Sequence, residues 1–268
     1  MQFFYQKTER FVHDDRFAKL VEHIQGPQAP TLRQLKAAFP DPGFEKFLDK
    51  LIEHELIVRK ERRYYLGFPI YSQKEIQAQQ EQLETSRFFG ETDTNQLLLS
   101  IYEQIKKKTY FFAVEDGIRL PAFYQVGNKT LQFYTVSYQN TSETSLPIYF
   151  TNNRNGEEDL NDPQLQQMIG DVNEEYFFDQ VAVILEKIPN KRIRRSIFLE
   201  ALLETKMIKP QDTSYQLLIP VIPEKAETDF PEVESLSVLQ LFLLADLLLS
   251  KQELQQINFI VLSPISEG

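Results

Sequence analysis

The sequence has no cysteine, only three histidines and only nine glycines among its 268 residues. The lack of cysteine excludes disulfides, thiol catalysis and cysteine-ligated metals. The histidines, His13, His23 and His54, all lie near the N-terminus, so the rest of the chain has none for a Ser-His-Asp triad or a His-ligated metal. His54 falls at the end of an expected helix, where a cation complements the helix dipole. We therefore expect no metal site and name no catalytic residue.

The scarcity of glycine leaves no common phosphate-binding loop, since neither GxxxxGK[ST] nor GxGxxG occurs. We therefore expect no cofactor. Long apolar runs are also missing. The most apolar segment, residues 238–249, is too short to cross a bilayer and contains Gln240 and Asp246, so it predicts a buried helix. Because the N-terminus has no signal-peptide pattern, the expected location is the cytoplasm, with no membrane partner.

Acidic residues outnumber basic ones, 39 to 29, and the formal net charge is −10. The charge is uneven along the chain. Residues 1–71 contain 12 Lys and Arg and 10 Asp and Glu, a net +2, which leaves 17 against 29, a net −12, for residues 72–268. This asymmetry predicts a domain boundary near residue 72. It also argues against nucleic-acid or anionic-membrane binding by the larger part.

The best-defined pattern in the chain spans residues 31–71. Thr31 is a good N-cap for a short helix over residues 32–39, which Pro40-Asp41-Pro42-Gly43 ends. Apolar residues at helical spacing predict a second helix from Phe44, and residues 56–58 and 64–66 predict a hairpin. A further helix over residues 17–24 precedes them. This order of helices followed by a hairpin resembles a winged helix, so residues 1–71 are expected to form a winged-helix-like module.

Four cations gather at the expected hairpin: Arg59, Lys60, Arg62 and Arg63. We interpret them as a contact for a protein partner or for nucleic acid. The second helix, which would read DNA in a winged helix, instead has a mixed outer face of Glu45, Lys46, Asp49, Lys50, Glu53 and His54. DNA-reading modules usually carry a clearly basic surface. The charge pattern therefore favours a protein partner and leaves nucleic acid as the alternative.

The larger part predicts a connecting helix over residues 72–89 and an acidic α+β domain over residues 90–268. A helix over 97–105 is followed by four expected strands, at 109–114, 120–126, 130–138 and 146–151, which suggest an antiparallel meander. Further expected elements are helices at 165–169, 176–188, 193–203 and 236–249 and strands at 215–222 and 257–262. The predicted fold class is α+β, with an antiparallel sheet and flanking helices.

The sequence also resembles two protein families. A helix, a strand that ends in an acidic residue and glycine, two more strands and the segment LPIYFT at 146–151 resemble the SseB-type domain over about residues 90–185. That family implies a small α/β module without an established enzymatic activity. An Asn- and Glu-rich insertion after Thr151 departs from the pattern. The whole chain, with RYYL at residues 63–66, also resembles a Gram-positive bacterial protein family of unknown function with a winged N-terminus.

Other charged clusters carry weaker signals. A local excess of positive charge is formed by Lys191, Arg192, Arg194 and Arg195. These residues are candidates for contact with an acidic partner, although docking on the chain's own acidic segment, residues 223–235, or simple solvation is favoured over an external partner. Glu115-Asp116 predicts a turn, and the carboxylates at 157–162 predict a solvated loop, although Thr151 to Asp162 has a distorted calcium-loop spacing. We expect a non-enzymatic interaction protein. A DNA-binding regulator with an acidic ligand-sensing domain and a carboxylate or metal-dependent hydrolase are the alternatives.

Overall fold

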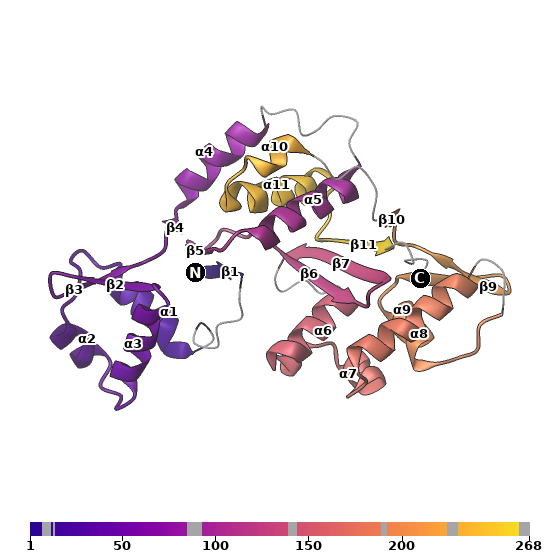
Figure 1. Ribbon diagram of the computed structural model, residues 1–268, viewed down its shortest axis with the longest axis horizontal. Helices are drawn as coiled ribbons and strands as arrows, with labels where there is room; N and C mark the ends of the chain where they lie inside the picture. Colours follow the sequence, from indigo (N-terminus) through magenta and orange to yellow (C-terminus); the bar gives the residue numbers. More distant parts are fainter. Residues whose placement is uncertain are drawn as a thin grey trace. The chain divides into compact units, whose positions relative to one another are not determined.

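The computed structural model describes residues 1–6, 12, 14–84, 93–138, 144–188, 192–223 and 230–262. Its helices and small sheets make the fold α+β, as the sequence predicts (Figure 1). The chain forms two compact units. Unit 1 consists of Met1–Ala78 and Lys106–Ile118, and unit 2 consists of Gln79–Ile105 and Arg119–Gly268. Residues 106–118, which the sequence pattern assigns to the larger domain, belong to unit 1 because they supply a strand of its sheet.

Unit 1 contains three helices and a hairpin in the expected order. They are α1 (Asp15–Ile24), α2 (Leu32–Ala38), α3 (Phe44–Glu53), β2 (Ile57–Lys60) and β3 (Arg63–Leu66). Thr31 caps α2 in a capping box with Gln34, which satisfies two backbone amides. The apolar faces of the helices meet the hairpin in one core, which includes Phe17, Leu20, Leu35, Phe44, Leu48, Leu51, Ile57 and Tyr64.

Unit 1 also contains a three-stranded sheet that the sequence pattern does not predict. Its strands are β1 (Gln2–Tyr5), β5 (Phe111–Val114) and β4 (Ile70–Tyr71), in that order. β5 is antiparallel to β1 and parallel to β4. The expected four-stranded meander is therefore wrong, because β5 pairs with strands that are distant in sequence and not with its neighbour in the chain.

Unit 2 is built on a four-stranded sheet of β10 (Val221–Pro223), β11 (Gln256–Leu262), β7 (Leu131–Tyr138) and β6 (Pro121–Gly127), in that order. Only β10 and β11 are parallel. The unit 2 part of α5 (Thr94–Lys107) and α11 (Val238–Lys251) cover one face of the sheet, as Tyr102 and Phe242 on either side of the Phe123 ring show. The short α10 (Pro231–Glu234) is on the same side (Figure 1). α4 (Gln73–Glu84) begins in unit 1 and continues into unit 2.

The opposite face of this sheet is covered by helices packed through aromatic side chains. They are α6 (Leu146–Asn155), α7 (Pro163–Ile169), α8 (Glu174–Lys187) and α9 (Ile197–Glu204). The ring centroids of Phe133 on β7 and Phe178 on α8 are 5.1 Å apart, and Phe150 on α6 lies 5.1 Å from Phe177. Asn173 caps α8.

Two expected strands of unit 2 are corrected. Residues 146–151, LPIYFT, begin α6, because Ser145 caps the helix and Pro147 suits its first turn. The strand at residues 146–151, on which the resemblance to the SseB-type domain partly rested, is therefore absent. Residues 215–222 do not form one strand. β9 (Ser214–Leu217) pairs with β8 (Ile208–Gln211) in a hairpin that the sequence pattern missed, and the chain then enters β10.

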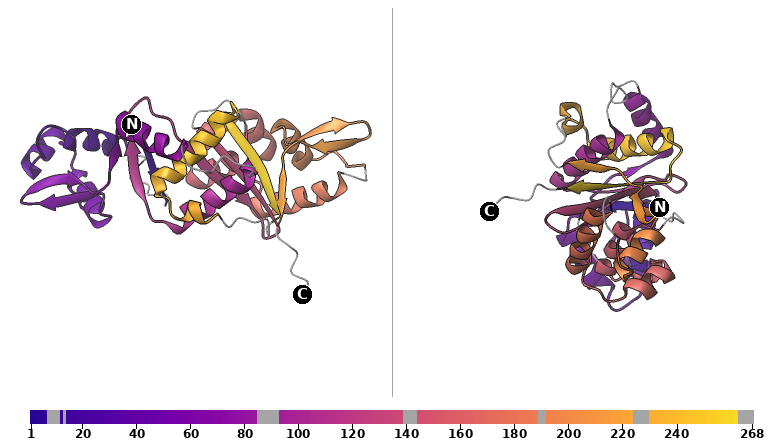
Figure 2. Two further views of the ribbon diagram at one scale, coloured as in Figure 1. Left: turned by 90° about the horizontal axis from the view of Figure 1, so that it is seen from above. Right: turned by 90° about the vertical axis from the view of Figure 1, so that its right-hand side faces the viewer.

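Both units contain the same chain motif. In each motif a helix is followed by a hairpin, a short strand, further helices and a last strand. The last strand is parallel to the short strand and antiparallel to an earlier strand: β5 with β4 and β1, and β11 with β10 and β7. Residues 51–71, LIEHELIVRKERRYYLGFPIY, align without a gap on residues 202–222, LLETKMIKPQDTSYQLLIPVI, with six identities in 21 positions. We call these two segments the paired segments. Each hairpin is a separate two-stranded ribbon (Figure 2).

Matching backbone hydrogen bonds confirm the correspondence. The amide of Leu56 donates to Leu51 O at 2.9 Å, and the amide of Met207, its counterpart, donates to Leu202 O at 2.9 Å. Both short strands begin after a proline whose carbonyl accepts from the last strand: Pro69 O from Ala113 N at 3.0 Å, and Pro220 O from Ile260 N at 2.9 Å. The chain thus carries an internal structural repeat, and β8–β9 is a second version of β2–β3.

A basic hairpin as candidate contact site

The basic hairpin, residues 57–66, is held by a tight two-residue turn. Ile57 pairs with Leu66 and Lys60 with Arg63. The turn residues Glu61 and Arg62 have φ of 49° and 63°, the left-handed values that a type I′ hairpin turn needs. Asn and Gly usually occupy such positions, so Arg62 is there despite a conformational cost and not because the turn favours it.

All four predicted cations are exposed on this hairpin. Two of them also make local contacts. The Arg63 guanidinium donates to Ala29 O at 2.6 Å, and the Arg59 guanidinium lies 5.8 Å from the centroid of the Tyr64 ring. Lys60 and Arg62 meet no carboxylate or other hydrogen-bond partner within the described residues. The structure therefore brings the predicted contact residues together at one exposed end.

The second hairpin shows what this fold requires at these positions. In the paired segments, Arg59, Lys60, Arg62 and Arg63 correspond to Pro210, Gln211, Thr213 and Ser214. The strand register is the same, and Asp212 has φ of 49°, as Glu61 does. The buried positions are kept instead: Ile57 matches Ile208, and Tyr64 matches Tyr215, which packs against the core of unit 2. A hairpin of this strand register thus forms without any of the four charges, although its second turn residue, Thr213, does not share the left-handed φ of Arg62.

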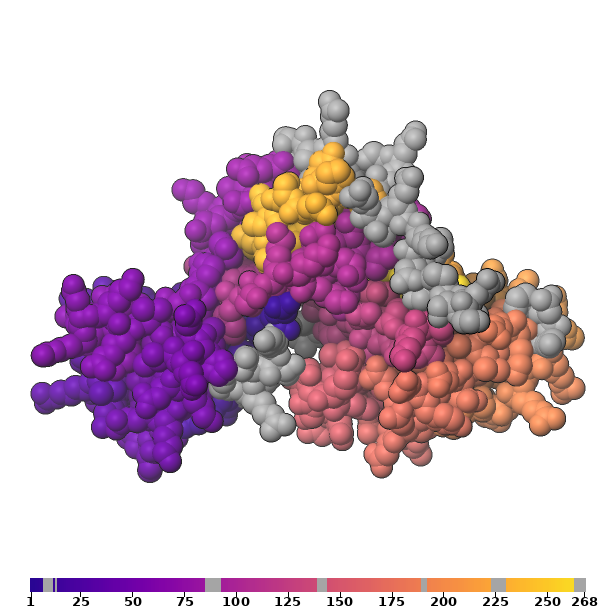
Figure 3. All heavy atoms as spheres, in the orientation of Figure 1, coloured from indigo at the N-terminus to yellow at the C-terminus, as the bar shows by residue number. Residues whose placement is uncertain are grey.

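The helix that precedes the basic hairpin has the mixed outer face that the sequence predicts. Its outward residues, all exposed, are Glu45, Lys46, Asp49, Lys50, Glu53 and His54. Glu45 also forms an ion pair with Lys36 of α2. His54 is at the C-cap of α3, as expected. The outer face of α3 therefore has no excess of positive charge, whereas the hairpin has four cations. The space-filling view shows long side chains standing out from the purple part of this unit (Figure 3).

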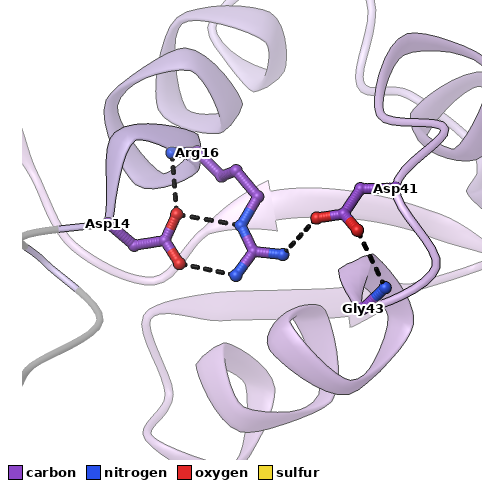
Figure 4. Close-up of polar contacts among 4 residues, drawn as sticks. All are labelled: Asp14, Arg16, Asp41 and Gly43. Carbon is purple, nitrogen blue, oxygen red and sulfur yellow. Dashed lines mark hydrogen bonds and ion pairs between the residues drawn. The ribbon is translucent and has the colours of Figure 1, made fainter.

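Arg16 joins two parts of unit 1 through contacts with Asp14, Asp41 and Phe47, which we call the arginine clasp (Figure 4). Asp14 caps α1, and its carboxylate accepts from Arg16 Nε at 2.8 Å and Nη2 at 2.5 Å. Arg16 Nη1 donates to Asp41 Oδ2 at 2.7 Å, in the loop before α3, and the guanidinium lies 4.6 Å from the Phe47 ring centroid. The hydrogen bonds from Arg16 lower the pKa of Asp14. The clasp ties the start of α1 to the start of α3.

The other predicted cation cluster is only partly described. Lys191 lies outside the described residues, and so do residues 224–229 of the acidic segment 223–235. Arg192, Arg194 and Arg195 are exposed and precede α9, which Ser196 caps. Arg195 Nε donates to Glu200 Oε1 at 2.8 Å. One cation of this cluster is thus paired with the helix that follows, and the docking surface proposed for it stays a prediction.

The acidic residues do not form a metal site in the described ranges, where no group of three or more His, Cys, Asp or Glu side chains could hold an ion. Asp116 pairs with the terminal amino group of Met1, and Glu115 accepts from the Gln73 amide at 3.3 Å. Residues 151–155 are helical, so the calcium-loop spacing does not form a loop. Asp162 caps α7.

Unit 2 contains a polar cluster around Asp246 that the sequence pattern did not predict. The Tyr138 hydroxyl donates to Asp246 Oδ1 at 2.6 Å, and Gln80 Nε2 donates to Asp246 Oδ2 at 2.9 Å. Burial raises the pKa of Asp246, although both hydrogen bonds oppose the rise. Burial and the neighbouring carboxylate raise the pKa of Tyr138 to about 12. The cluster joins α4, α11 and β7, and its contacts account for Asp246 in an otherwise apolar helix.

Comparison with known proteins finds one family model that is similar to part of the chain. Residues 2–107 match DUF1803, a domain of unknown function, and this range includes β1, the basic hairpin and α5. No curated protein and no solved structure matches the chain. No helix in the described ranges is long and apolar enough to span a membrane.

Proposed function

We propose that this is a non-enzymatic, cytoplasmic interaction protein that contacts a protein partner through the basic hairpin. The hairpin belongs to a winged-helix-like module, a proposal supported by the order of α1, α2, α3, β2 and β3. The DUF1803 match over residues 2–107 is consistent with a family that lacks an assigned role.

The observation that carries the proposal is the comparison of the two hairpins. The uncharged residues at the four corresponding positions of β8–β9 show that the strand register does not depend on the four cations of β2–β3. Unpaired like charges at a hairpin tip repel one another, which is unfavourable for folding. A role in binding an acidic surface explains why Lys60 and Arg62 are there, since charge complementarity speeds and orients association.

A pull-down from native lysate with and without nuclease tests the proposal. We expect nuclease-resistant capture of a defined partner, lost in the double variant Lys60→Gln, Arg62→Gln. The matched control is Lys209→Gln, Lys187→Gln, which removes two exposed charges from unit 2 outside the predicted cation cluster. Equal capture by the binding variant and the control would contradict the proposal.

Binding to duplex DNA is the second candidate, favoured by the winged-helix-like order of elements and by the basic hairpin. The carboxylates on the outer face of α3 argue against it, because phosphates repel them. Titration with labelled duplex DNA over a range of salt concentrations tests this candidate. An affinity that falls steeply with salt and is lost in the Lys60→Gln, Arg62→Gln variant would support DNA binding. The hydrolase alternative is not proposed, since no observation favours it.

A further inference from the structure

The two edges of the basic hairpin are not equivalent. Across a two-residue turn, successive residues direct their backbone groups alternately toward the partner strand and away from it. Tyr64 directs its amide away from β2, where it donates to Pro30 O at 3.0 Å, and Thr31 bridges to Arg63 on the same side. The outer edge of β3 is thus occupied by the chain itself.

The outer edge of β2 is open at the position opposite Tyr64. Arg59 pairs with Tyr64, so its amide and carbonyl point away from β3. Neither group meets a hydrogen-bond partner among the described residues. An exposed strand edge of this kind is a template on which another strand can pair.

The second hairpin closes this same position. Arg59 corresponds to Pro210, which pairs with Tyr215 in the same register and has no amide hydrogen. Proline on an edge strand is a common protection against pairing with a further strand. The repeat therefore contains one hairpin whose edge is protected by Pro210 and one with an open edge beside Arg59, Lys60 and Arg62.

We propose that the edge of β2 binds an extended acidic polypeptide segment, which adds to the hairpin as a third strand. Backbone hydrogen bonds to Arg59 supply the pairing, and the cations select carboxylate side chains on the incoming strand. This inference rests on the proposed function and specifies its partner: an acidic stretch of another protein in the extended conformation.

The test measures binding of a fluorescent peptide of alternating glutamate and threonine to the full chain by anisotropy. A second peptide has the same sequence and charge but N-methyl groups on all of its backbone nitrogens, so neither of its two edges can pair as a strand on the β2 edge. We expect the methylated peptide to bind about fivefold more weakly, since it loses backbone hydrogen bonds of modest net value. This comparison uses the unaltered protein and does not depend on the folding of a variant.

Two variants separate charge from pairing. Arg59→Gln removes the charge and keeps the amide, and Arg59→Pro removes both, with Pro210 as evidence that the hairpin accepts proline there. We expect Arg59→Pro to bind about threefold more weakly than Arg59→Gln, the effect of one lost backbone hydrogen bond.

Each other outcome is informative. Strand addition is overturned if the two peptides bind equally and Arg59→Pro binds as well as Arg59→Gln. If the double variant Lys60→Gln, Arg62→Gln still binds more weakly in that case, the proposed contact remains intact. No binding of either peptide overturns the inference, and the pull-down then decides the proposed function separately. Tighter, hairpin-dependent binding of duplex DNA than of the peptide overturns both.

Discussion

The arginine clasp of unit 1 gives a prediction that can be worked out from the structure. Arg16→Met keeps an apolar stem over Phe47 but removes the paired hydrogen bonds to Asp14 and the bond to Asp41. The side chains of Arg16 and Asp14 are 31% and 28% exposed, so their ion pair is only partly screened by solvent. The paired bonds, the exposed contact to Asp41 and the cation–π contact together stabilise unit 1 by about 2 kcal/mol.

The effect on stability should depend on pH. Because hydrogen bonds from Arg16 lower the pKa of Asp14 below its usual value of 3.8, the unfolded chain binds this proton more readily than the folded chain. The stabilisation is therefore present above pH 3.8 and is lost as the pH falls through the lower, folded-state pKa. We expect Arg16→Met and its parent to differ near neutral pH and to converge in acid.

The absence of tryptophan from the sequence allows unit 1 to be followed separately. Phe39→Trp, a change at a partly buried ring stacked on Phe44, provides a fluorescent reporter and the common background for urea unfolding. Asp14→Asn is the matched variant, because its amide oxygen can still cap α1 without charge. The reasoning would be refuted by equal urea midpoints near neutral pH, or by a difference that persists undiminished in acid.

Three further predictions concern the framework. Gly67→Ala should destabilise unit 1 by more than about 2 kcal/mol in urea unfolding, because an added Cβ would lie 1.8 Å from the Glu55 carbonyl oxygen. A smaller loss would show that this contact relaxes easily. Asp246→Asn should flatten the pH dependence of unit 2 melting: the raised pKa of Asp246 means that the folded chain holds its proton more tightly than the unfolded chain, so stability falls as the pH rises above 3.8. An unchanged pH profile would contradict this. Phe177→Ala should cost about 3–5 kcal/mol in calorimetry of unit 2, since the side chain is fully buried among aromatic rings.

Local signals in the sequence predicted the elements of unit 1 that depend on neighbouring residues. Thr31 is the N-cap of α2, and the apolar spacing of residues 44–52 matches the buried face of α3. The segment at 146–151 misled because aromatic and β-branched residues favour strands. Ser145 followed by Pro147 was the local signal for a helix start, and it prevailed.

Long-range pairing accounts for what the sequence could not show. β5 resembles the first strand of a meander, yet its partners begin at Gln2 and Ile70, and no pattern within β5 selects them. The cluster around Asp246 likewise joins residues that are far apart in the chain. For the site, the four cations were visible in the sequence. The open edge of β2 was not, because the sequence does not show that the segment at Pro30 pairs with β3 and not with β2.

The repeat separates what folding requires from what it tolerates. Within the paired segments, the identical residues include Leu51 and Leu202, Ile57 and Ile208, and Pro69 and Pro220, which fill the cores or accept the same hydrogen bonds. The hairpin ends share none of residues 58–63 with their counterparts, and basic residues occur at four of these positions in one copy only. Packing and these hydrogen bonds explain the shared residues named here. The strand register does not require the charge on the basic hairpin, and the proposed partner would account for that charge.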